Sequence, residues 1–317
     1  MGAVLMLTGA AGAQGDWPTR PVTMVIPFAA GGPTDVLGRV MAERMSQILG
    51  QQVVVENVGG AGGMTGSQRV ARAAPDGSSF VLGTVGTHAQ NQTLYKKPAY
   101  DAASDFAPAA FIAEVPLVLI TRKDFPANTL QDFIKYAKEN QAKMTFGSAG
   151  AGSATHLGCV LLNSAMGVDI SHVPYRGTGP AMQDLAGGRI DYMCEIVTTA
   201  LPQIEGGAVK AVATLTKARS PVLPKLATAD EQGLKDFEAY TWNAFFLPKG
   251  TPEPIIKKLH DASVQAMETP AVKDRLQGLG ASLVAPERRS PDYLAKFVRS
   301  EIEKWAVPIK ASGVSME

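Results

Sequence analysis

Apolar positions along the chain follow two alternating patterns. Short runs rich in Val, Ile and Phe, of which residues 22–27 (VTMVIP) are the first, have the composition of buried strands. Longer stretches with an apolar residue every three or four positions, of which residues 33–49 are the first, have the period of amphipathic helices. Gly50 follows that stretch directly and is a typical helix stop. The alternation predicts βαβ units and an α/β fold throughout.

The two patterns divide the chain into expected elements. Strands are expected at residues 22–27, 53–56, 80–83, 111–121, 144–146, 171–174, 190–196, 209–214, 239–247 and 281–284. Helices are expected at residues 33–49, from the glycine-rich segment 59–66 through 74, at 130–139, from 154 onward, between the strands of 171–214, and at 253–269, 272–279 and 291–311. Pro116 interrupts the fourth strand, because proline lacks the N–H that a sheet ladder uses.

Two strand-like segments, 114–116 and 238–242, predict the domain organisation. If the chain crosses between domains at both places, residues 14–115 and 241–317 form one lobe and residues 116–240 form the other. Two α/β lobes that are joined by two strand crossovers make a hinged molecule with a cleft between them. We therefore expect a two-lobed α/β protein rather than one continuous domain.

The first residues predict export. Residues 3–8 are apolar, residues 9–14 are small, and Ala11-Gly12-Ala13 fits the A-x-A pattern that signal peptidase reads. We expect residues 1–13 to be the remnant of a signal peptide and the mature chain to begin near Gln14. No later segment approaches the run of ~20 apolar residues that a membrane-spanning helix needs.

Composition and charge exclude several classes of protein. The 30 Lys and Arg residues nearly balance the 29 Asp and Glu residues, which argues against a strongly basic nucleic-acid-binding protein. Two cysteines cannot form a disulfide-rich scaffold, and the four histidines are too scattered to mark a metal site. The chain contains neither a P-loop pattern nor G-x-S-x-G. We expect no nucleic-acid partner, no metal and no other cofactor.

Two loops share a design in which a strand leads through small residues into a helix. They span residues 27–35 (PFAAGGPTD) and 147–156 (GSAGAGSATH). Glycine lets the backbone approach a ligand, and the helix N-terminus behind each loop supplies free N–H donors and partial positive charge. Because neither loop contains Lys or Arg, the pattern favours a carboxylate over a polyphosphate. The candidate binding residues here are Phe28, Ala29, Ala30, Gly31, Gly32, Pro33, Thr34, Asp35, Ser148, Ala149, Gly150, Gly152, Ser153, Ala154, Thr155 and His156.

The second loop also permits a different function. His156 follows Ser148 and Ser153 closely, so the alternative is an exported α/β hydrolase in which one of these serines is the nucleophile and His156 its base. No acid that would orient the histidine is evident nearby. A capping or packing role for His156 is the other interpretation.

Two buried-looking features each allow two interpretations. Glu195 lies in the apolar segment 192–196 and is either a strand-end carboxylate or a cleft residue that selects the far end of a ligand. Cys159 and Cys194 either form a disulfide in an oxidising compartment or are two separate buried thiols.

Taken in order, the motifs of the chain resemble one family over essentially the whole mature sequence. The resemblance is carried by Trp17-Pro18, the segment 27–35, Val54-Val55-Glu56-Asn57 with its glycine-rich sequel, Ala73-Ala74-Pro75-Asp76-Gly77, the segment 147–157, His172-Val173-Pro174-Tyr175-Arg176-Gly177, Trp242 and Pro248-Lys249-Gly250-Thr251-Pro252. On these residues the chain is similar to the substrate-binding proteins of tripartite tricarboxylate transporters, also called the Bug family.

The resemblance implies a fold and a function. The fold would be the two-lobed periplasmic-binding-protein fold (a type II-like Venus flytrap) with two strand crossovers at the hinge. The protein would be a monomeric periplasmic receptor that does no chemistry. It would capture a small carboxylate, either a dicarboxylate or an aromatic acid, and deliver it to a membrane permease.

The resemblance also implies which residues hold the ligand. One ligand carboxylate would lie between the segments 28–35 and 148–156, held by backbone groups, hydroxyls and bridging waters. The opposite end of the cleft, which selects the ligand, would be lined by Thr84, Thr87, Thr178, Glu195 and Thr198. Ala30 stands where loops of this family often carry proline, a change that leaves a backbone site intact.

Overall fold

One long strand, β4 (Phe106–Arg122), joins the two halves of the sheet. The computed structural model describes residues 17–317, so the expected signal-peptide remnant and cleavage site lie outside the described residues. The strands follow the order β2-β1-β3-β9-β4-β7-β5-β6, and β8 and β10 also pair with β4. The other strands are β1 (Val22–Ile26), β2 (Val53–Asn57), β3 (Ser79–Thr84), β5 (Thr145–Ser148), β6 (Ser171–Pro174), β7 (Tyr192–Ile196), β8 (Val209–Thr214), β9 (Tyr240–Pro248) and β10 (Ser282–Leu283).

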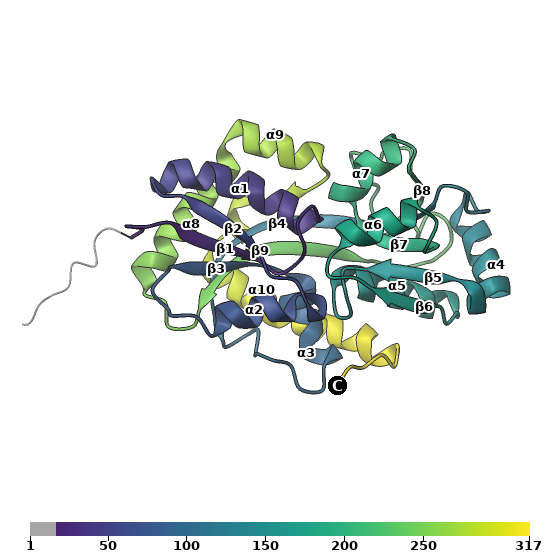
Figure 1. The fold of residues 1–317 in the computed structure, drawn as a ribbon, viewed down its shortest axis with the longest axis horizontal. Helices are drawn as coiled ribbons and strands as arrows, with labels where there is room; N and C mark the ends of the chain where they lie inside the picture. The colour runs from purple at the N-terminus through teal and green to yellow at the C-terminus, as the bar shows by residue number, and fades with distance from the viewer. Residues whose placement is uncertain (1–16) are drawn as a thin grey trace, which may run out of the picture.

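Helices cover both faces of this sheet (Figure 1). They are α1 (Pro33–Leu49), α2 (Met64–Ala71), α3 (Asn91–Leu94), α4 (Leu130–Asn140), α5 (Ala154–Met166), α6 (Thr178–Ala186), α7 (Val197–Glu205), α8 (Glu253–Glu268), α9 (Pro270–Gly278) and α10 (Pro291–Ala311). Four short helical turns complete the set: η1 (Ala61–Gly63), η2 (Gly86–Gln90), η3 (Gln141–Lys143) and η4 (Pro286–Arg288). None of the helices within residues 17–317 is long and apolar enough to cross a membrane.

The pairing partner of β4 changes in its middle. Up to Pro116, which lies opposite Tyr240, β4 pairs with β9. From Leu117 onward it pairs with β7 and β8. We call the part built around β1, β2, β3, β9 and β10 lobe 1, and the part built around β5, β6, β7 and β8 lobe 2 (Figure 1). The strand expected to break at Pro116 is therefore continuous, because proline sits where one ladder gives way to the next and its missing N–H is tolerated.

One buried segment was missed by the pattern of apolar residues. Residues 86–94 form η2 and α3, although they are mostly polar and lack a helical apolar period. Every residue from 81 to 91 is buried. The helix is stabilised there by packing against both lobes and α10, which local sequence does not reveal.

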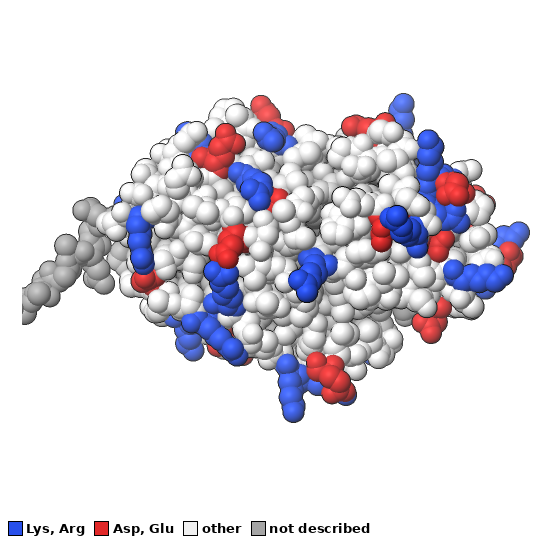
Figure 2. All heavy atoms as spheres, viewed as in Figure 1, with Lys and Arg blue, Asp and Glu red and all other residues white. Residues whose placement is uncertain are grey.

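The surface carries no dominant charge on the face shown in Figure 2. Lys and Arg side chains are interspersed there with Asp and Glu. This distribution fits the net charge of +1. Long-range electrostatics therefore do not steer a charged ligand in one direction over this face.

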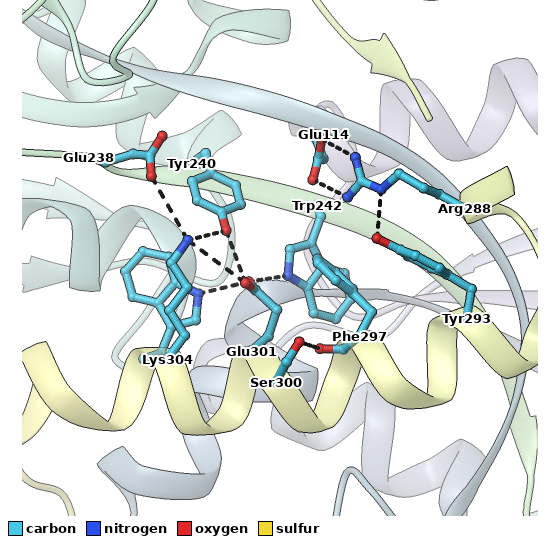
Figure 3. A network of polar contacts seen from close by, with 11 residues as sticks. Glu114, Glu238, Tyr240, Trp242, Arg288, Tyr293, Phe297, Ser300, Glu301 and Lys304 are labelled. Atoms are coloured by element: carbon cyan, nitrogen blue, oxygen red, sulfur yellow. Dashed lines mark hydrogen bonds and ion pairs between the residues drawn. The ribbon is translucent and has the colours of Figure 1, made fainter. Parts of the chain in front are cut away.

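A buried carboxylate ties α10 to the strand that enters lobe 1 (Figure 3). Glu301 is 3% exposed and accepts hydrogen bonds from three groups. Trp242 Nε1–H and Trp305 Nε1–H donate to its Oε2 at 2.9 Å each, and Tyr240 O–H donates to Oε1 at 3.0 Å. Because Tyr240 and Trp242 belong to β9, this network fixes α10 beside the crossover strand.

We predict that Glu301→Gln destabilises the protein by about 1–3 kcal/mol, because an amide offers one acceptor oxygen to three buried donors. The measurement is the free energy of unfolding in urea. The matched control is Glu303→Gln on the same helix, whose side chain is exposed and whose replacement should change that free energy by less than about 0.5 kcal/mol. Equal effects of the two substitutions would contradict the role given to the network.

Candidate functional site

A cavity lies between the lobes, and its empty space is about 340 Å³ including the part that is open to solvent. Residues of the β1–α1 loop, α1, β3 and β9 line it from lobe 1, and residues of the β5–α5 loop, α5, α6 and β7 line it from lobe 2. The lining residues are Phe28, Gly32, Pro33, Thr34, Thr84, Ala149, Ser153, Ala154, Thr155, Thr178, Ile196 and Thr241. None of them is charged, so the polar groups offered to a ligand are backbone N–H groups and threonine and serine hydroxyls.

The first wall is the start of α1. Gly32 is its N-cap and Pro33 its first residue, and both line the cavity. The free N–H groups of the first turn point out of this end of the helix, toward the cavity. Asp35 fixes the preceding loop, since its carboxylate accepts hydrogen bonds from Gly31 N–H and Asn57 Nδ2–H, both at 2.9 Å. Arg39 Nε–H donates to the same carboxylate at 2.9 Å. Arg39 is thus engaged by Asp35 and is not a lining residue.

Electrostatics keep Asp35 ionised. Burial would raise the pKa of its carboxyl, but the hydrogen bonds from Arg39, Gly31 and Asn57 outweigh it and hold the pKa below the ordinary value. The Asp35 side chain is 5% exposed, so its charge is stabilised by hydrogen bonds from the protein and not by water. The negative charge sits one turn into the helix, where the dipole favours it.

The second wall is the start of α5. Ser153 is the N-cap, and its Oγ accepts from His156 N–H at 3.2 Å. Thr155 Oγ1 accepts from Ala149 N–H at 2.9 Å, which folds the loop back over the helix end. Two helix N-termini, one from each lobe, therefore meet at a cavity without charged side chains.

The lobes touch backbone to backbone around this cavity. Ala29 N–H donates to Arg176 O at 3.1 Å, and Tyr95 O–H donates to Ala151 O at 3.2 Å. Gly62 lies so close to the opposite loop that a Cβ there would stand 2.1 Å from Ala151 O. The lobes are thus closed on each other in this structure, and where Gly62 meets Ala151 the contact depends on the absence of a side chain.

The candidate residues from the sequence fall into three groups in the structure. Those that line the cavity are Phe28, Gly32, Pro33, Thr34, Thr84, Ala149, Ser153, Ala154 and Thr155. Those that line a second, outer groove beside it are Ala30, Gly31 and Thr198. Those that line neither are Ala29, Asp35, Ser148, Gly150, Gly152, His156 and Glu195.

Two lining residues, Ile196 and Thr241, were not among the candidates. Both stand where strands cross the cleft, Ile196 at the end of β7 and Thr241 near the start of β9. The expected crossover at 238–242 was the available signal for Thr241. Thr178, which the family resemblance suggested, lines both the cavity and the outer groove.

The structure does not pair His156 with Ser148 or Ser153 in the way that the hydrolase alternative requires. Ser148 Oγ hydrogen-bonds His172 Nε2 at 2.7 Å, and His156 Nδ1 accepts from Gly152 N–H at 3.2 Å, so His156 serves neither Ser148 nor Ser153 as a base. Burial lowers the pKa of His156 to about 3 and that of His172 to about 4. These serines and histidines hold the loop together.

The two cysteines are neighbouring buried thiols. Cys159 and Cys194 are both free, and Cys194 N–H donates to Cys159 Sγ at 2.9 Å. Burial raises the pKa of the Cys194 thiol well above its ordinary value. Of the two interpretations open from the sequence, the structure has the pair as thiols.

Glu195 is the one fully buried carboxyl of β7 (0% exposed). Its Oε1 accepts from Thr199 Oγ1–H at 2.7 Å, whereas Oε2 has no hydrogen-bond partner in the part of the chain that the structure describes. Burial raises the pKa of this carboxyl to about 7, although the Thr199 and Thr178 hydroxyls and Ile196 N–H oppose the rise. Glu195 is adjacent to Thr178 and does not line the cavity.

Comparison with known proteins places this geometry in a family. Residues 37–314 match the family model described as the tripartite tricarboxylate transporter family receptor. The chain belongs to this family. It is a solute-binding protein of the tripartite tricarboxylate transporter receptor type, as the sequence motifs indicated.

Solved structures agree with this membership. The periplasmic binding protein BugD is 42% identical, with a TM-score of 0.92 over 95% of this chain and all of BugD. MatC from Rhodopseudomonas palustris, solved with bound malate, is 42% identical, with a TM-score of 0.90 over 92% of this chain and all of MatC. R. palustris Rpa4515, solved with adipate, is 34% identical, with a TM-score of 0.90 over 95% of this chain and 99% of Rpa4515. The expected periplasmic-binding-protein fold is confirmed.

We predict that Asp35→Asn lowers the free energy of unfolding at pH 7 by about 1.5–3 kcal/mol, since hydrogen bonds from three donors to an ionised carboxylate are weakened. Because the folded pKa of Asp35 lies below its ordinary value of 3.8, its contribution is present above that value and is lost as pH falls below it. The difference between the wild type and the variant in urea unfolding should therefore narrow below pH 3.8. Glu43→Gln, exposed on the same helix, is the control, and a gap that stays constant with pH would contradict the argument.

Proposed function

We propose that this receptor binds a small dicarboxylate between its lobes, in the cavity walled by the N-termini of α1 and α5. The observation that carries the proposal is the convergence of two helix N-termini on a cavity between the lobes that has hydroxyls and backbone N–H groups but no charged side chain. An anion is stabilised there by preorganised donors rather than by an ion pair. The residues that would contact it are the cavity-lining residues named above.

The structural relatives support the choice of a dicarboxylate. MatC holds malate and Rpa4515 holds adipate, which are linear diacids of four and six carbons. The cavity of this chain is small and has polar groups on more than one side, with Thr84 on lobe 1 and Thr178 on lobe 2. A carboxylate at the two helix ends leaves those hydroxyls for the second acidic group.

The other parts of the proposed function are taken from the resemblance to the family. The receptor would be monomeric, would act in the periplasm after removal of the leader near Gln14, and would deliver its ligand unchanged to membrane permease subunits. The hinge would lie where the chain crosses near Pro116 and near Tyr240, with residues 14–115 and 241–317 in lobe 1 and 116–240 in lobe 2. Closure about such a hinge buries the ligand and changes the surface that a permease meets.

We predict that L-malate or adipate raises the melting temperature of the purified protein. At 100 times its dissociation constant a ligand adds about 2.7 kcal/mol, which should shift the melting temperature by about 5 °C or more. Differential scanning fluorimetry against succinate, L-malate, adipate, citrate and benzoate measures this, after unfolding and refolding to remove any bound solute. Stabilisation by benzoate alone would replace the dicarboxylate with an aromatic acid, and no stabilisation by any of the acids would overturn the proposal.

We predict that Gly62→Ala weakens binding of the stabilising acid at least tenfold, which is about 1.4 kcal/mol, because its Cβ would meet Ala151 O across the closed contact. The matched control is Gly167→Ala. Gly167 has nearly the same backbone conformation (φ 70° against 60°) but open space around it, so the control carries the backbone strain without the clash. Isothermal titration calorimetry compares the two, and equal loss of affinity in both would show that the contact between the lobes does not govern binding.

A further inference from the structure

Glu195 and Thr178 are two of the buried side chains with unpaired polar atoms, and Thr178 lines both the cavity and the outer groove. Glu195 is 0% exposed and Thr178 3% exposed. Neither Glu195 Oε2 nor Thr178 Oγ1 has a hydrogen-bond partner of good geometry among residues 17–317. An unpaired buried polar atom costs about 1–3 kcal/mol, so two neighbouring ones need an explanation.

The two groups adjoin each other. Thr178 is the first residue of α6, and its hydroxyl is close enough to the Glu195 carboxyl to influence the pKa of that carboxyl. Thr178 also reaches toward lobe 1, where a Cβ on Gly32 would lie 3.6 Å from Thr178 Oγ1. The hydroxyl is thus adjacent to both a buried carboxyl and the cavity.

No cation compensates Glu195. The elements packed against β7 are β4, β5, α5, α6 and α7, and the titratable groups they carry are Glu114, Arg122, His156, Cys159, Asp184 and Glu205. On β7 itself Tyr192 and Cys194 complete the set, and across the cleft Asp35 and Arg39 pair with each other. Arg122 is engaged by Asp124 and Asp191. On β4 the residue directly opposite Glu195 is Val118.

We propose that Glu195 is a positioning residue for the ligand: in its neutral form it donates from Oε2 to Thr178 Oγ1 and thereby turns the Thr178 O–H toward the anion in the cavity. The assignment follows from the free atoms, since Oε1 already accepts from Thr199 and Oε2 is the oxygen left to carry the proton. If Glu195 were ionised, the Thr178 O–H would turn back to the carboxylate. Its lone pairs would then face the ligand and repel it.

Binding of the ligand is therefore coupled to uptake of one proton by the protein. This inference rests on the proposed capture of an acid by closure of the lobes. Thr178 Oγ1 faces lobe 1, where a Cβ on Gly32 would lie 3.6 Å from it, so separating the lobes would open this side of the Thr178–Glu195 pair to water. A carboxyl in contact with water is ionised above its ordinary pKa of 4.5, whereas burial raises the pKa of Glu195 in this structure to about 7. Between these two values, closure takes up one proton from solvent onto Glu195 Oε2. Affinity for a fixed dianion should rise as pH falls from about 7 toward 5, by up to tenfold per pH unit, and should be nearly flat above pH 8.

The experiment is isothermal titration calorimetry with L-malate or adipate, whichever stabilises the protein more. Titrations in two buffers of different ionisation enthalpy give the number of protons taken up at each pH. The wild type should take up close to one proton per ligand at about pH 6 and close to none at about pH 8.5. Uptake that does not differ between the two conditions would overturn the inference.

Glu195→Gln separates this role from a structural one. The amide keeps an oxygen for Thr199 and supplies a permanent donor to Thr178, so the variant should take up no proton. It should also bind about tenfold more tightly than the wild type at pH 8.5. The wild type and the variant are titrated with the same ligand at the same pH. Protonation of malate or adipate therefore changes both affinities equally and does not alter their ratio. A Glu195→Gln variant that folds but binds less tightly than the wild type at pH 8.5 would overturn the inference.

Two more variants complete the test. Thr178→Val should lower affinity about tenfold while proton uptake persists, since Glu195 is still buried on closure. Glu205→Gln, exposed at the end of α7, should change neither quantity and is the control. If neither L-malate nor adipate binds, the proposed function fails and this inference with it. If one binds without proton uptake, the inference alone fails.

Discussion

The close approach of glycine backbone across the cleft is the constraint on which the rest of the site depends. A Cβ on Gly62 would stand 2.1 Å from Ala151 O of the opposite loop, and a Cβ on Gly152 would meet the side chains of Asn91 and Tyr95 from lobe 1. The first turns of α1 and α5 face one cavity from opposite sides. Wherever such contact excludes water, every hydrogen bond that a bound anion accepts is strengthened. Bulkier loops would leave two helix ends too far apart to share a ligand.

Because no charged side chain lines the cavity, the charged side chains near it act on the ligand through other groups. Arg39 is held by Asp35, so the cation near the first loop shapes the backbone instead of meeting the ligand. Glu195 has no such partner and is therefore sensitive to burial itself. An anion site made of neutral donors depends on which way each hydroxyl points, and a buried carboxyl beside one hydroxyl is sufficient to decide that. Affinity in such a site rests on orientation rather than on net charge.

In the proposed closure, the crossover strands bend while their surroundings stay fixed. β4 changes partner between Pro116 and Leu117, and β9 begins at Tyr240 on the opposite strand. Next to this place, Arg288 donates to Glu114 of β4 and Glu301 of α10 holds Tyr240 and Trp242 of β9 (Figure 3). The lobe 1 side of the crossing is therefore anchored to η4 and α10, which leaves motion to the few residues between the anchored part and lobe 2.

The sequence by itself determined most of the elements and the composition of the two candidate binding loops. The bounds of α1, β6, β8 and α10 coincide with those expected, and α1 and α10 combine a clear apolar period with local start and stop signals. The two cation-free loops were evident because glycines and helix starts are local features. Only the tertiary structure decided that residues 86–94 are helical, that Ser148 pairs with His172, that Ile196 and Thr241 reach the cavity, and that Glu195 is adjacent to Thr178. Each of these depends on residues brought together from distant parts of the chain, and burial and pairing of that kind have no period in the sequence.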